Sequence, residues 1–216
     1  MALPDDDYVA GLIDAQLAVN LPRSGKAPAR ITLTSSDLRV ADEMAFLVPS
    51  RVTLVKRPGK KDVCVCQFTG DGARRVLDFA AAKCVTKKGL ALAALAYMDG
   101  AKTAEDVQDA RAIPPPEGDV SVRWASGFFD VRGEIVPAVR DDAGKKKRRA
   151  SVKLPLPRAE RDILPSLQGT LAGRVKKSSP TRLVFESRDA IQELQRMLGE
   201  HLRVKKAELE AVAVAE

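Results

Sequence analysis

Three cysteines and a single histidine are the metal-binding sulfur and nitrogen side chains of this sequence. Cys64 and Cys66 are separated by one residue, Cys84 stands apart, and His201 is far along the chain. A common zinc site needs four such ligands, often in pairs separated by two residues. Alternation along a strand turns both Cys64 and Cys66 toward the same face, the core. We therefore expect buried, inert cysteines, no metal site and no cofactor.

Positive charge is the second chemical feature, and it suits a polyanion. Lys and Arg number 36 against 29 Asp and Glu, which gives a net charge of +7. Such an excess favours nucleic acid or an anionic membrane surface, although many charged runs are only solvated faces. The longest apolar stretch, 90–98, is far shorter than the roughly 20 residues that cross a bilayer, so we expect no membrane-spanning helix.

Two similar phrases lie in the two halves of the chain. Residues 9–15 read Val-Ala-Gly-Leu-Ile-Asp-Ala, and residues 125–131 read Ala-Ser-Gly-Phe-Phe-Asp-Val. Small residues on a helix let a second helix backbone approach closely. We therefore expect a helix interface formed by Ala10, Gly11, Ser126 and Gly127.

A charged segment that ends in prolines separates the halves. The run Ile-Pro-Pro-Pro-Glu-Gly at 113–118 cannot continue a helix or a central strand. The sequence thus predicts a first repeat at 1–98, a linker at 99–119 and a second repeat at 120–216. Pro4 and the acidic run at 5–7 are unlike a secretory or transit leader, so we expect no such signal in this sequence.

Hydrophobic periodicity predicts the order αββαββα in both repeats, followed by one further helix in the first. The first has helices at 8–15, 38–47, 73–82 and 89–98, with hairpin strands at 17–21, 29–35, 51–56 and 62–68. The second has helices at 120–131, 159–171 and 189–202, with strands at 134–140, 150–156, 174–177 and 181–187. The predicted fold is α+β, with two αββαββα repeats related by a pseudo-twofold axis.

Alternation also separates two faces of each predicted sheet. The face expected to pack on helices carries Ile31, Leu33, Val52, Leu54, Val152, Leu154, Leu156, Leu183 and Phe185. The opposite face carries Arg30, Thr32, Thr34, Arg51, Thr53, Lys153, Arg174, Lys176 and Arg182. Aromatic residues make up only 4% and mostly fall at core positions, so base stacking is not expected. The expected partner is structured and helical nucleic acid.

Residues 10–15 resemble the start of the LAGLIDADG motif, and Gly-Phe-Phe-Asp at 127–130 resembles a common variant of it. The chain as a whole is similar to single-chain, two-motif LAGLIDADG homing endonucleases and maturases. The resemblance implies a monomer with an internal pseudo-dimer, in which the motif helices form the interface and saddle-shaped antiparallel sheets lie on the DNA major groove. Lys87 with Lys88 and Lys205 with Lys206 resemble basic pairs that the family places near its cleavage centre; ordinary helix-terminal lysines are the alternative.

The departure from the family concerns catalysis. Family endonucleases hold divalent metal with the acidic residue two places after the first Asp of each motif, and here those positions are Gln16 and Arg132. Without these carboxylates the phosphate's developing charge is not neutralised by metal, so we expect no catalytic residues and no enzyme. Arg132 can clasp a phosphate directly, or both positions are simply decayed. In the family the first Asp, here Asp14 and Asp130, is mainly a structural residue at the helix end.

The predicted nucleic-acid contacts combine the open sheet faces, the basic loops and the basic pairs. They are Arg30, Thr32, Thr34, Arg51, Thr53, Lys56, Arg57, Lys60, Lys61, Lys87, Lys88, Arg132, Lys145, Lys146, Lys147, Arg148, Arg149, Lys153, Arg174, Lys176, Lys177 and Arg182. For each residue, a solvated charge is the alternative interpretation.

The resemblance and the lost carboxylates together imply a catalytically inactive protein that binds structured RNA, either ribosomal RNA or intron RNA. It would act in an organellar ribonucleoprotein beside other subunits, as a ribosomal accessory protein or an intron maturase, in a mitochondrion or a chloroplast. The alternative is a homing endonuclease that cleaves double-stranded DNA, with divalent metal held by Glu134 or Asp130. A third hypothesis is a scaffold that contacts only proteins.

Overall fold

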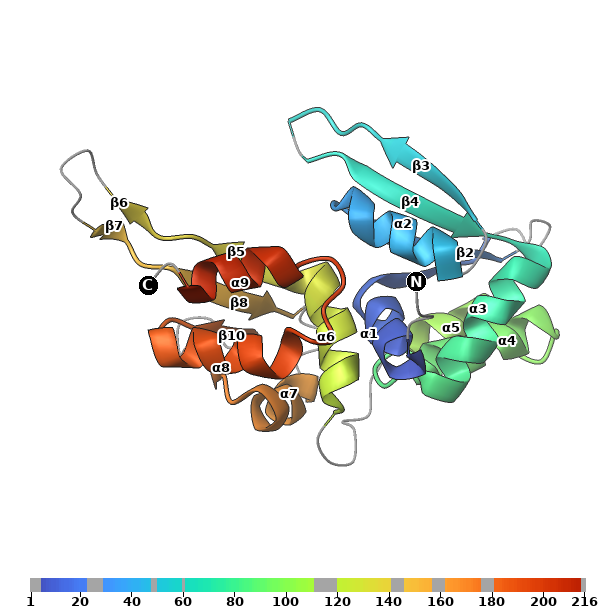
Figure 1. Ribbon diagram of the computed structural model, residues 1–216. Coiled ribbons are helices and arrows are strands. Elements are labelled where there is room, and N and C mark those ends of the chain that lie inside the picture. The colour runs from blue at the N-terminus through green and yellow to red at the C-terminus, as the bar shows by residue number, and fades with distance from the viewer. Residues whose placement is uncertain are drawn as a thin grey trace. The chain divides into compact units, whose positions relative to one another are not determined.

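The computed structural model describes residues 5–22, 29–47, 50–59, 61–110, 120–140, 146–156, 162–175 and 181–214. The chain divides into two compact units, Met1–Pro114 and Pro115–Glu216 (Figure 1). The division lies within the segment 99–119 that the sequence predicts as a linker. Part of that segment is helical, however, because Thr103 and Asp106 form a reciprocal capping box at the start of α5 (Ala104–Asp109).

The first unit is a four-stranded antiparallel sheet with helices packed on one face. Its strand order is β1-β2-β4-β3, and α1, α2 and α3 contact the sheet. The elements are α1 (Asp6–Gln16), β1 (Leu17–Asn20), β2 (Arg30–Ser35), α2 (Leu38–Leu47), β3 (Arg51–Val55), β4 (Val63–Phe68), α3 (Gly70–Lys83), α4 (Lys88–Met98) and α5.

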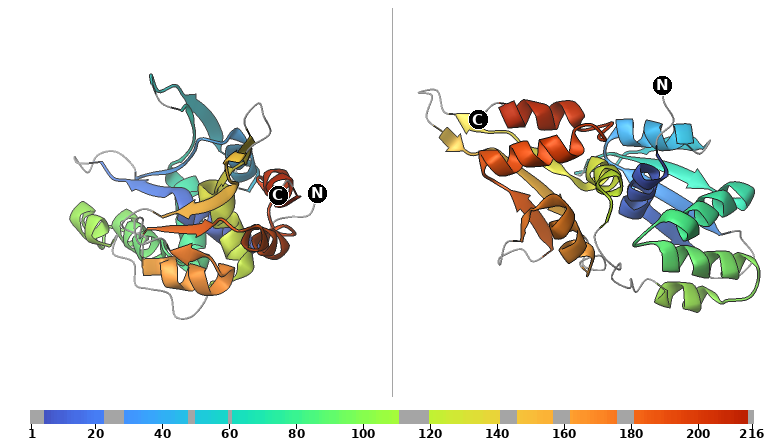
Figure 2. Two further views of the ribbon diagram at one scale, coloured as in Figure 1. Left: turned by 90° about the vertical axis from the view of Figure 1, so that its left-hand side faces the viewer. Right: turned by 60° about the horizontal axis from the view of Figure 1, so that its bottom comes forward.

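The second unit repeats this topology with one added hairpin and, among its described residues, without a counterpart of α5. Its main sheet has the order β5-β8-β10-β9, and a separate two-stranded sheet pairs β6 with β7. Helices α8 and α9 pack side by side, as the views in Figure 2 show. The elements are α6 (Val122–Arg132), β5 (Glu134–Val136), β6 (Val139–Arg140), β7 (Lys146–Arg148), β8 (Ser151–Pro155), α7 (Leu164–Leu171), β9 (Arg174–Val175), β10 (Arg182–Phe185), α8 (Arg188–Leu198) and α9 (Lys206–Val214).

Local sequence signals account for these boundaries. Asp5 caps α1 by accepting from the Asp7 backbone N–H at 2.9 Å, and Ser121 caps α6 by accepting from Trp124 N–H at 3.1 Å. In β2, Ile31 and Leu33 are buried while Arg30 and Thr34 are exposed. The predicted α+β fold of two matching repeats is therefore confirmed.

Several predicted boundaries in the second unit are wrong. The strand expected at 134–140 is two strands, β5 and β6, because Pro137 cannot donate to the ladder. Helix α7 begins at Leu164 and not at residue 159, with Pro165 in its first turn, where the missing N–H costs no helical hydrogen bond. The helix expected at 189–202 ends at Leu198, followed by Gly199, and α9 is a separate helix.

The predicted apolar faces are confirmed except on β3. Ile31, Leu33, Val152, Leu154, Leu156, Leu183 and Phe185 are each at most 5% exposed. On β3, Val52 is only half-buried and Leu54 is 58% exposed. Strand β3 is the edge of its sheet. Alternation gives the side of the sheet correctly, but an edge residue lacks neighbours on one flank.

Candidate nucleic-acid interface

The two motif helices run straight into the first strands of their sheets. Helix α1 ends at Gln16 and β1 begins at Leu17, whereas α6 ends at Arg132 and Gly133 precedes β5. The Gly133 N–H donates to Phe129 O at 2.7 Å, and a Cβ on Gly133 would lie 2.7 Å from the Phe129 ring. The second unit thus needs glycine where the first has leucine, because a phenylalanine ring fills the turn.

Asp14 anchors the segment that leads into α4. Its buried carboxylate accepts hydrogen bonds from the backbone N–H groups of Val85 at 2.7 Å, Thr86 at 3.0 Å and Lys87 at 2.7 Å. The Thr86 hydroxyl donates a fourth, at 2.8 Å. The carboxylate therefore ties α1 to the start of a helix far along the chain.

Asp130 has the same role in the second unit. Its carboxylate, 0% exposed, accepts from the backbone N–H groups of Arg203 at 2.9 Å, Val204 at 3.1 Å and Lys205 at 2.8 Å. This segment leads into α9. The structural role expected for Asp14 and Asp130 is thereby confirmed, and both carboxylates are already engaged by backbone donors.

The two lysines of each basic pair, Lys87 with Lys88 and Lys205 with Lys206, differ in their burial. Lys205 donates from Nζ to the carbonyl oxygens of Gly133 at 2.7 Å and of Phe129 and Val131 at 3.4 Å, so its ammonium caps the C-terminal end of α6. Lys87 is half-buried, whereas Lys88 and Lys206 are exposed at the first positions of α4 and α9. The sequence gives no sign of the Lys205 contacts, since they depend on how the segment before α9 lies against the end of α6.

The two positions where the family carries metal-binding acids are uncharged or cationic. Gln16 is 9% exposed, and its Nε2 has no hydrogen-bond partner among the described residues. Arg132 is half-buried. Over the described parts of the chain, no group of three or more His, Cys, Asp or Glu side chains could hold a metal ion.

Glu134, the acid proposed for the alternative endonuclease, is exposed at the start of β5 opposite Lys153 on β8. The topologically equivalent position on β1 is Ala18, which lies opposite Thr32 on β2. A carboxylate at this place therefore exists in the second unit without a counterpart in the first.

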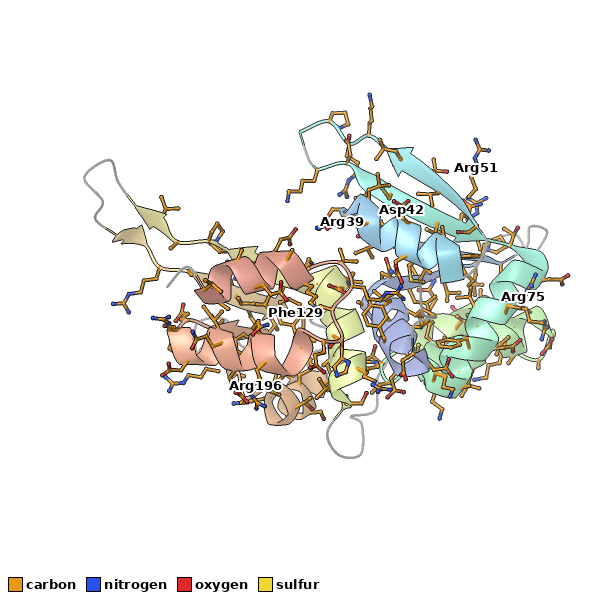
Figure 3. The ribbon with its side chains drawn as sticks, viewed as in Figure 1. Arg39, Asp42, Arg51, Arg75, Phe129 and Arg196 are labelled. Carbon is orange, nitrogen blue, oxygen red and sulfur yellow. The ribbon has the colours of Figure 1, made fainter. Side chains whose placement is uncertain are left out.

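Strand register defines the face of the first sheet that the helices leave open. One row across the sheet runs Ala18, Thr32, Gln67 and Arg51. Thr32 is half-buried, whereas Arg30, Thr34, Arg51 and Thr53 are exposed; Arg51 projects from the start of β3 (Figure 3). The predicted contacts of this sheet therefore share one face. We call it the first open face.

The corresponding row of the second sheet has a different chemistry. It runs Glu134, Lys153, Val184 and Arg174, and Arg182 lies opposite Pro155 on the same face. Arg174 is exposed, Lys153 and Arg182 are half-buried, and Val184 is buried, at 4% exposed. We call this surface the second open face.

Two polar residues of the first open face are absent from the predicted contacts. Gln67 is exposed between Thr32 and Arg51, and Asn20 donates from Nδ2 to Thr32 Oγ1 at 3.1 Å. Continued alternation along residues 17–20 and 63–68 identifies both positions.

The basic loops are described in part. Lys56, Arg57 and Lys61 are exposed at the β3–β4 hairpin, where Arg57 Nε donates to Lys61 O at 3.0 Å. Arg149 is exposed before β8. The remaining predicted contacts lie outside the described residues or have side chains outside them: Lys60, Lys145, Lys146, Lys147, Arg148, Lys176 and Lys177.

The four small residues of the motif helices, Ala10, Gly11, Ser126 and Gly127, are all buried. Ser126 donates its hydroxyl proton to Val122 O within its own helix, at 2.8 Å. The close approach of the two motif helices stays a prediction.

The cysteines are buried, as predicted. Cys64, Cys66 and Cys84 are free thiols at most 4% exposed, and Cys84 Sγ donates to Ala10 O at 3.6 Å. Burial raises the pKa of the Cys66 and Cys84 thiols. Among the described helices, none has the length and apolar character required to cross a membrane.

Comparison with solved structures places the chain in a known fold. It is similar to I-SmaMI, a LAGLIDADG homing endonuclease bound to cleaved DNA, with a TM-score of 0.66, 14% identity and coverage of 95% of this chain and 86% of that one. It is also similar to the LAGLIDADG homing endonuclease I-GzeII in complex with its DNA target (TM-score 0.68, 12% identity, 97% and 90% coverage). It is similar as well to the LAGLIDADG homing endonuclease I-LtrWI bound to target DNA, with a TM-score of 0.67, 14% identity and coverage of 97% of this chain and 88% of that one.

No protein-family model matches the sequence, and no curated protein matches it. The similarity to the solved structures shows that the chain has the two-repeat fold of LAGLIDADG homing endonucleases. With sequence identities of 12–14%, these structures show the fold alone.

Proposed function

We propose that this protein binds double-helical nucleic acid on its two open faces and does not hydrolyse it. The observation that carries the proposal is the pairing of cationic open faces with Gln16 and Arg132 at the ends of the motif helices. In the fold that this chain shares, three solved endonucleases are bound to DNA.

The absence of hydrolysis follows from the ligands that Mg²⁺ requires. The ion needs hard anionic oxygens and near-octahedral geometry. Gln16 supplies at best a neutral amide oxygen, and the Arg132 guanidinium repels a cation. Asp14 and Asp130 are buried and held by backbone N–H groups. Glu134 has Ala18 as its counterpart, so a matched pair of metal sites cannot form at these positions.

For the target we propose structured RNA, ribosomal or intronic, within a ribonucleoprotein of a mitochondrion or chloroplast, where the protein would also meet neighbouring subunits. The support is the resemblance to a family whose members without catalysis persist as maturases or as ribonucleoprotein components. The few aromatic residues fit a target bound by groove and phosphate, since unpaired bases are commonly bound by aromatic stacking.

Double-stranded DNA is the second candidate. The specific observation in its favour is that I-SmaMI, I-GzeII and I-LtrWI are each bound to DNA. A two-dimensional array of side chains on a sheet also fits the wide major groove of B-form DNA better than the deep, narrow major groove of A-form RNA.

The decisive experiment is crosslinking of the protein in its native extract, followed by sequencing of the attached nucleic acid. RNA reads that cluster on structured segments support the proposed target, and DNA reads move the protein to the second candidate. In parallel, purified protein is incubated with Mg²⁺ or Mn²⁺ and a library of DNA duplexes. We expect intact duplexes, and a specific double-strand break would contradict the absence of hydrolysis.

A further inference from the structure

The two open faces have the same strand order and unlike side chains. The first carries five neutral hydrogen-bonding residues, Asn20, Thr32, Thr34, Thr53 and Gln67, together with Arg30, Arg51 and the apolar residues Ala18, Val55, Val63 and Val65. Among the described residues of the second, the only neutral hydrogen-bonding side chain is Ser151, and it is 9% exposed. The other described residues there are Glu134, Val136, Lys153, Pro155, Arg174, Arg182 and Val184.

This difference separates two kinds of recognition. Base edges are read by side chains that match a pattern of donors and acceptors, above all amides and guanidinium groups. Phosphates are bound by cations irrespective of sequence. Gln67 stands between Thr32 and Arg51 in one cross-strand row, whereas Val184, which offers no hydrogen bond, stands between Lys153 and Arg174 in the equivalent row.

One amide group of the first open face is also oriented. Asn20 Nδ2 donates to Thr32 Oγ1 at 3.1 Å, although both side chains lie on the open side of the sheet. A held amide loses less side-chain entropy on binding than a free one and presents its remaining donor and acceptor in a fixed direction. The hydrogen bond thus holds Asn20 beside Thr32, next to the row Thr32, Gln67 and Arg51.

We propose a division of labour that rests on the proposed function, with double-stranded DNA as the partner: the first unit reads the sequence of the duplex, with Gln67 and Arg51 as its specificity-determining residues. The second unit binds the sugar-phosphate backbone through Lys153 and Arg174 without sequence preference. The protein consequently recognises an asymmetric target, one half of which is defined by sequence and the other only by the presence of a duplex.

The test measures binding to a pool of duplexes of randomised sequence, prepared once as DNA and once as RNA. Selection with the wild-type protein gives an enriched duplex, and its affinity is compared with that of a scrambled duplex. We expect the enriched sequence to be constrained in one half only. Gln67→Ala and Arg51→Ala each lower the ratio of the two affinities by about tenfold, the order expected when one base is no longer recognised.

Lys153→Ala and Arg174→Ala are the matched variants of the second unit. We expect each to weaken binding of the enriched and scrambled duplexes by the same factor. Each also reduces the slope of log affinity against log salt by about 0.9, the value for one neutralised phosphate on B-form DNA. The exposed positions of Gln67, Arg51 and Arg174 keep these variants folded, which circular dichroism verifies.

The outcomes separate the two proposals. A wild-type protein that binds neither pool overturns the proposed function and the division of labour together. Salt-sensitive binding without any enriched sequence leaves the proposed function standing and overturns the division of labour. The division of labour is also overturned if Gln67→Ala and Arg51→Ala leave the selectivity unchanged while Lys153→Ala or Arg174→Ala abolishes it.

Discussion

Asp14 and Asp130 show what single residues of the motif contribute. Each carboxylate is buried at the end of a motif helix and accepts hydrogen bonds from three consecutive backbone N–H groups before α4 or α9. Hydrogen bonds to an ionised acceptor are roughly twice as strong as neutral ones. The two residues therefore hold a packed helix in place, which is a requirement of folding and not of chemistry.

Asp14→Asn and Asp130→Asn are expected to destabilise the protein by about 2–4 kcal/mol each, because the amide NH₂ group faces backbone donors and the buried charge is removed. Chemical denaturation measures the free energy of unfolding. Asp109→Asn is the matched control, an exposed acid on α5. Equal effects at the three positions would contradict the proposed anchoring role.

Lys205 and Lys206 form a second matched pair at the residue scale. Lys205→Met keeps the aliphatic stem but removes the ammonium that caps α6, and we expect a loss of about 1–2 kcal/mol. Lys206→Met, at the exposed first position of α9, is expected to change stability little. Thermal denaturation compares the two, and a larger effect at Lys206 would show that the Lys205 hydrogen bonds are not stabilising.

The buried Cys84 thiol makes stability depend on alkaline pH. Its pKa in the folded protein lies above the ordinary value of 9.0, mainly because burial disfavours the thiolate. The unfolded state therefore releases this proton first as pH rises, and the contribution to stability is complete below pH 9.0 and falls above it. For one such proton the slope approaches about 1.4 kcal/mol per pH unit. We expect Cys84→Ala to flatten the pH dependence of the unfolding free energy above pH 9.0, and an unchanged slope would refute the assignment.

At the scale of elements, the sequence predicts the order of helices and strands in both repeats, because apolar residues recur with a different period in helices and in strands. Periodicity does not predict the end of an element, or the burial of its residues, where these depend on packing against other elements. Leu54 follows the alternation of β3 but remains 58% exposed at a sheet edge. Helix α5 is too polar and short to be recognised within a linker, although its capping box is present in the sequence.

Some residues of the candidate site can be predicted from local sequence, whereas the contacts of others cannot. The open-face residues follow from alternation, and Asn20 and Gln67 could have been found by the same rule. The partners of Asp14, Asp130 and Lys205 lie more than 70 residues away in sequence. No local pattern marks them, because they are set by the packing of α4 and α9.

Gly133 tests the turn between α6 and β5. In Gly133→Ala the new Cβ meets the Phe129 ring and its carbonyl oxygen at 2.7 Å, so we expect a loss of about 1–3 kcal/mol from overpacking. Gly72→Ala in the first turn of α3 is the control, since nothing lies within 4 Å of its Cβ position. This control should be neutral or slightly stabilising, because alanine is the better helix former. A destabilised control with an unaffected Gly133→Ala would contradict the account of the turn.

At the scale of the whole molecule, a net charge of +7 is distributed over two units of one topology. Long-range attraction to a polyanion depends on this total, whereas discrimination depends on which face carries amides. Affinity and selectivity are therefore expected to respond to different substitutions, and net charge alone does not report selectivity.

Substitutions in the β3–β4 hairpin measure how much its cations contribute to the electrostatic attraction between the protein and a duplex. Removing two exposed cations with Lys56→Gln and Lys61→Gln is expected to reduce the salt slope of duplex binding by up to about 0.9 for each phosphate that is no longer neutralised. The control is Arg75→Gln with Lys102→Gln, which removes the same charge from the helical side of the unit. If both double variants lower the slope equally, net charge accounts for the effect and the hairpin does not bind phosphate.

The anchoring of α4 and α9 by Asp14 and Asp130 has a consequence for how such proteins are recognised. In this chain the acid that makes each motif visible, Asp14 or Asp130, is the one that ties the motif helix to the segment before α4 or α9. The positions on which our proposal of binding without hydrolysis depends, Gln16 and Arg132, are the last residues of α1 and α6, outside the core of the motif. A motif match therefore reports shape, and the chemistry has to be read two residues later.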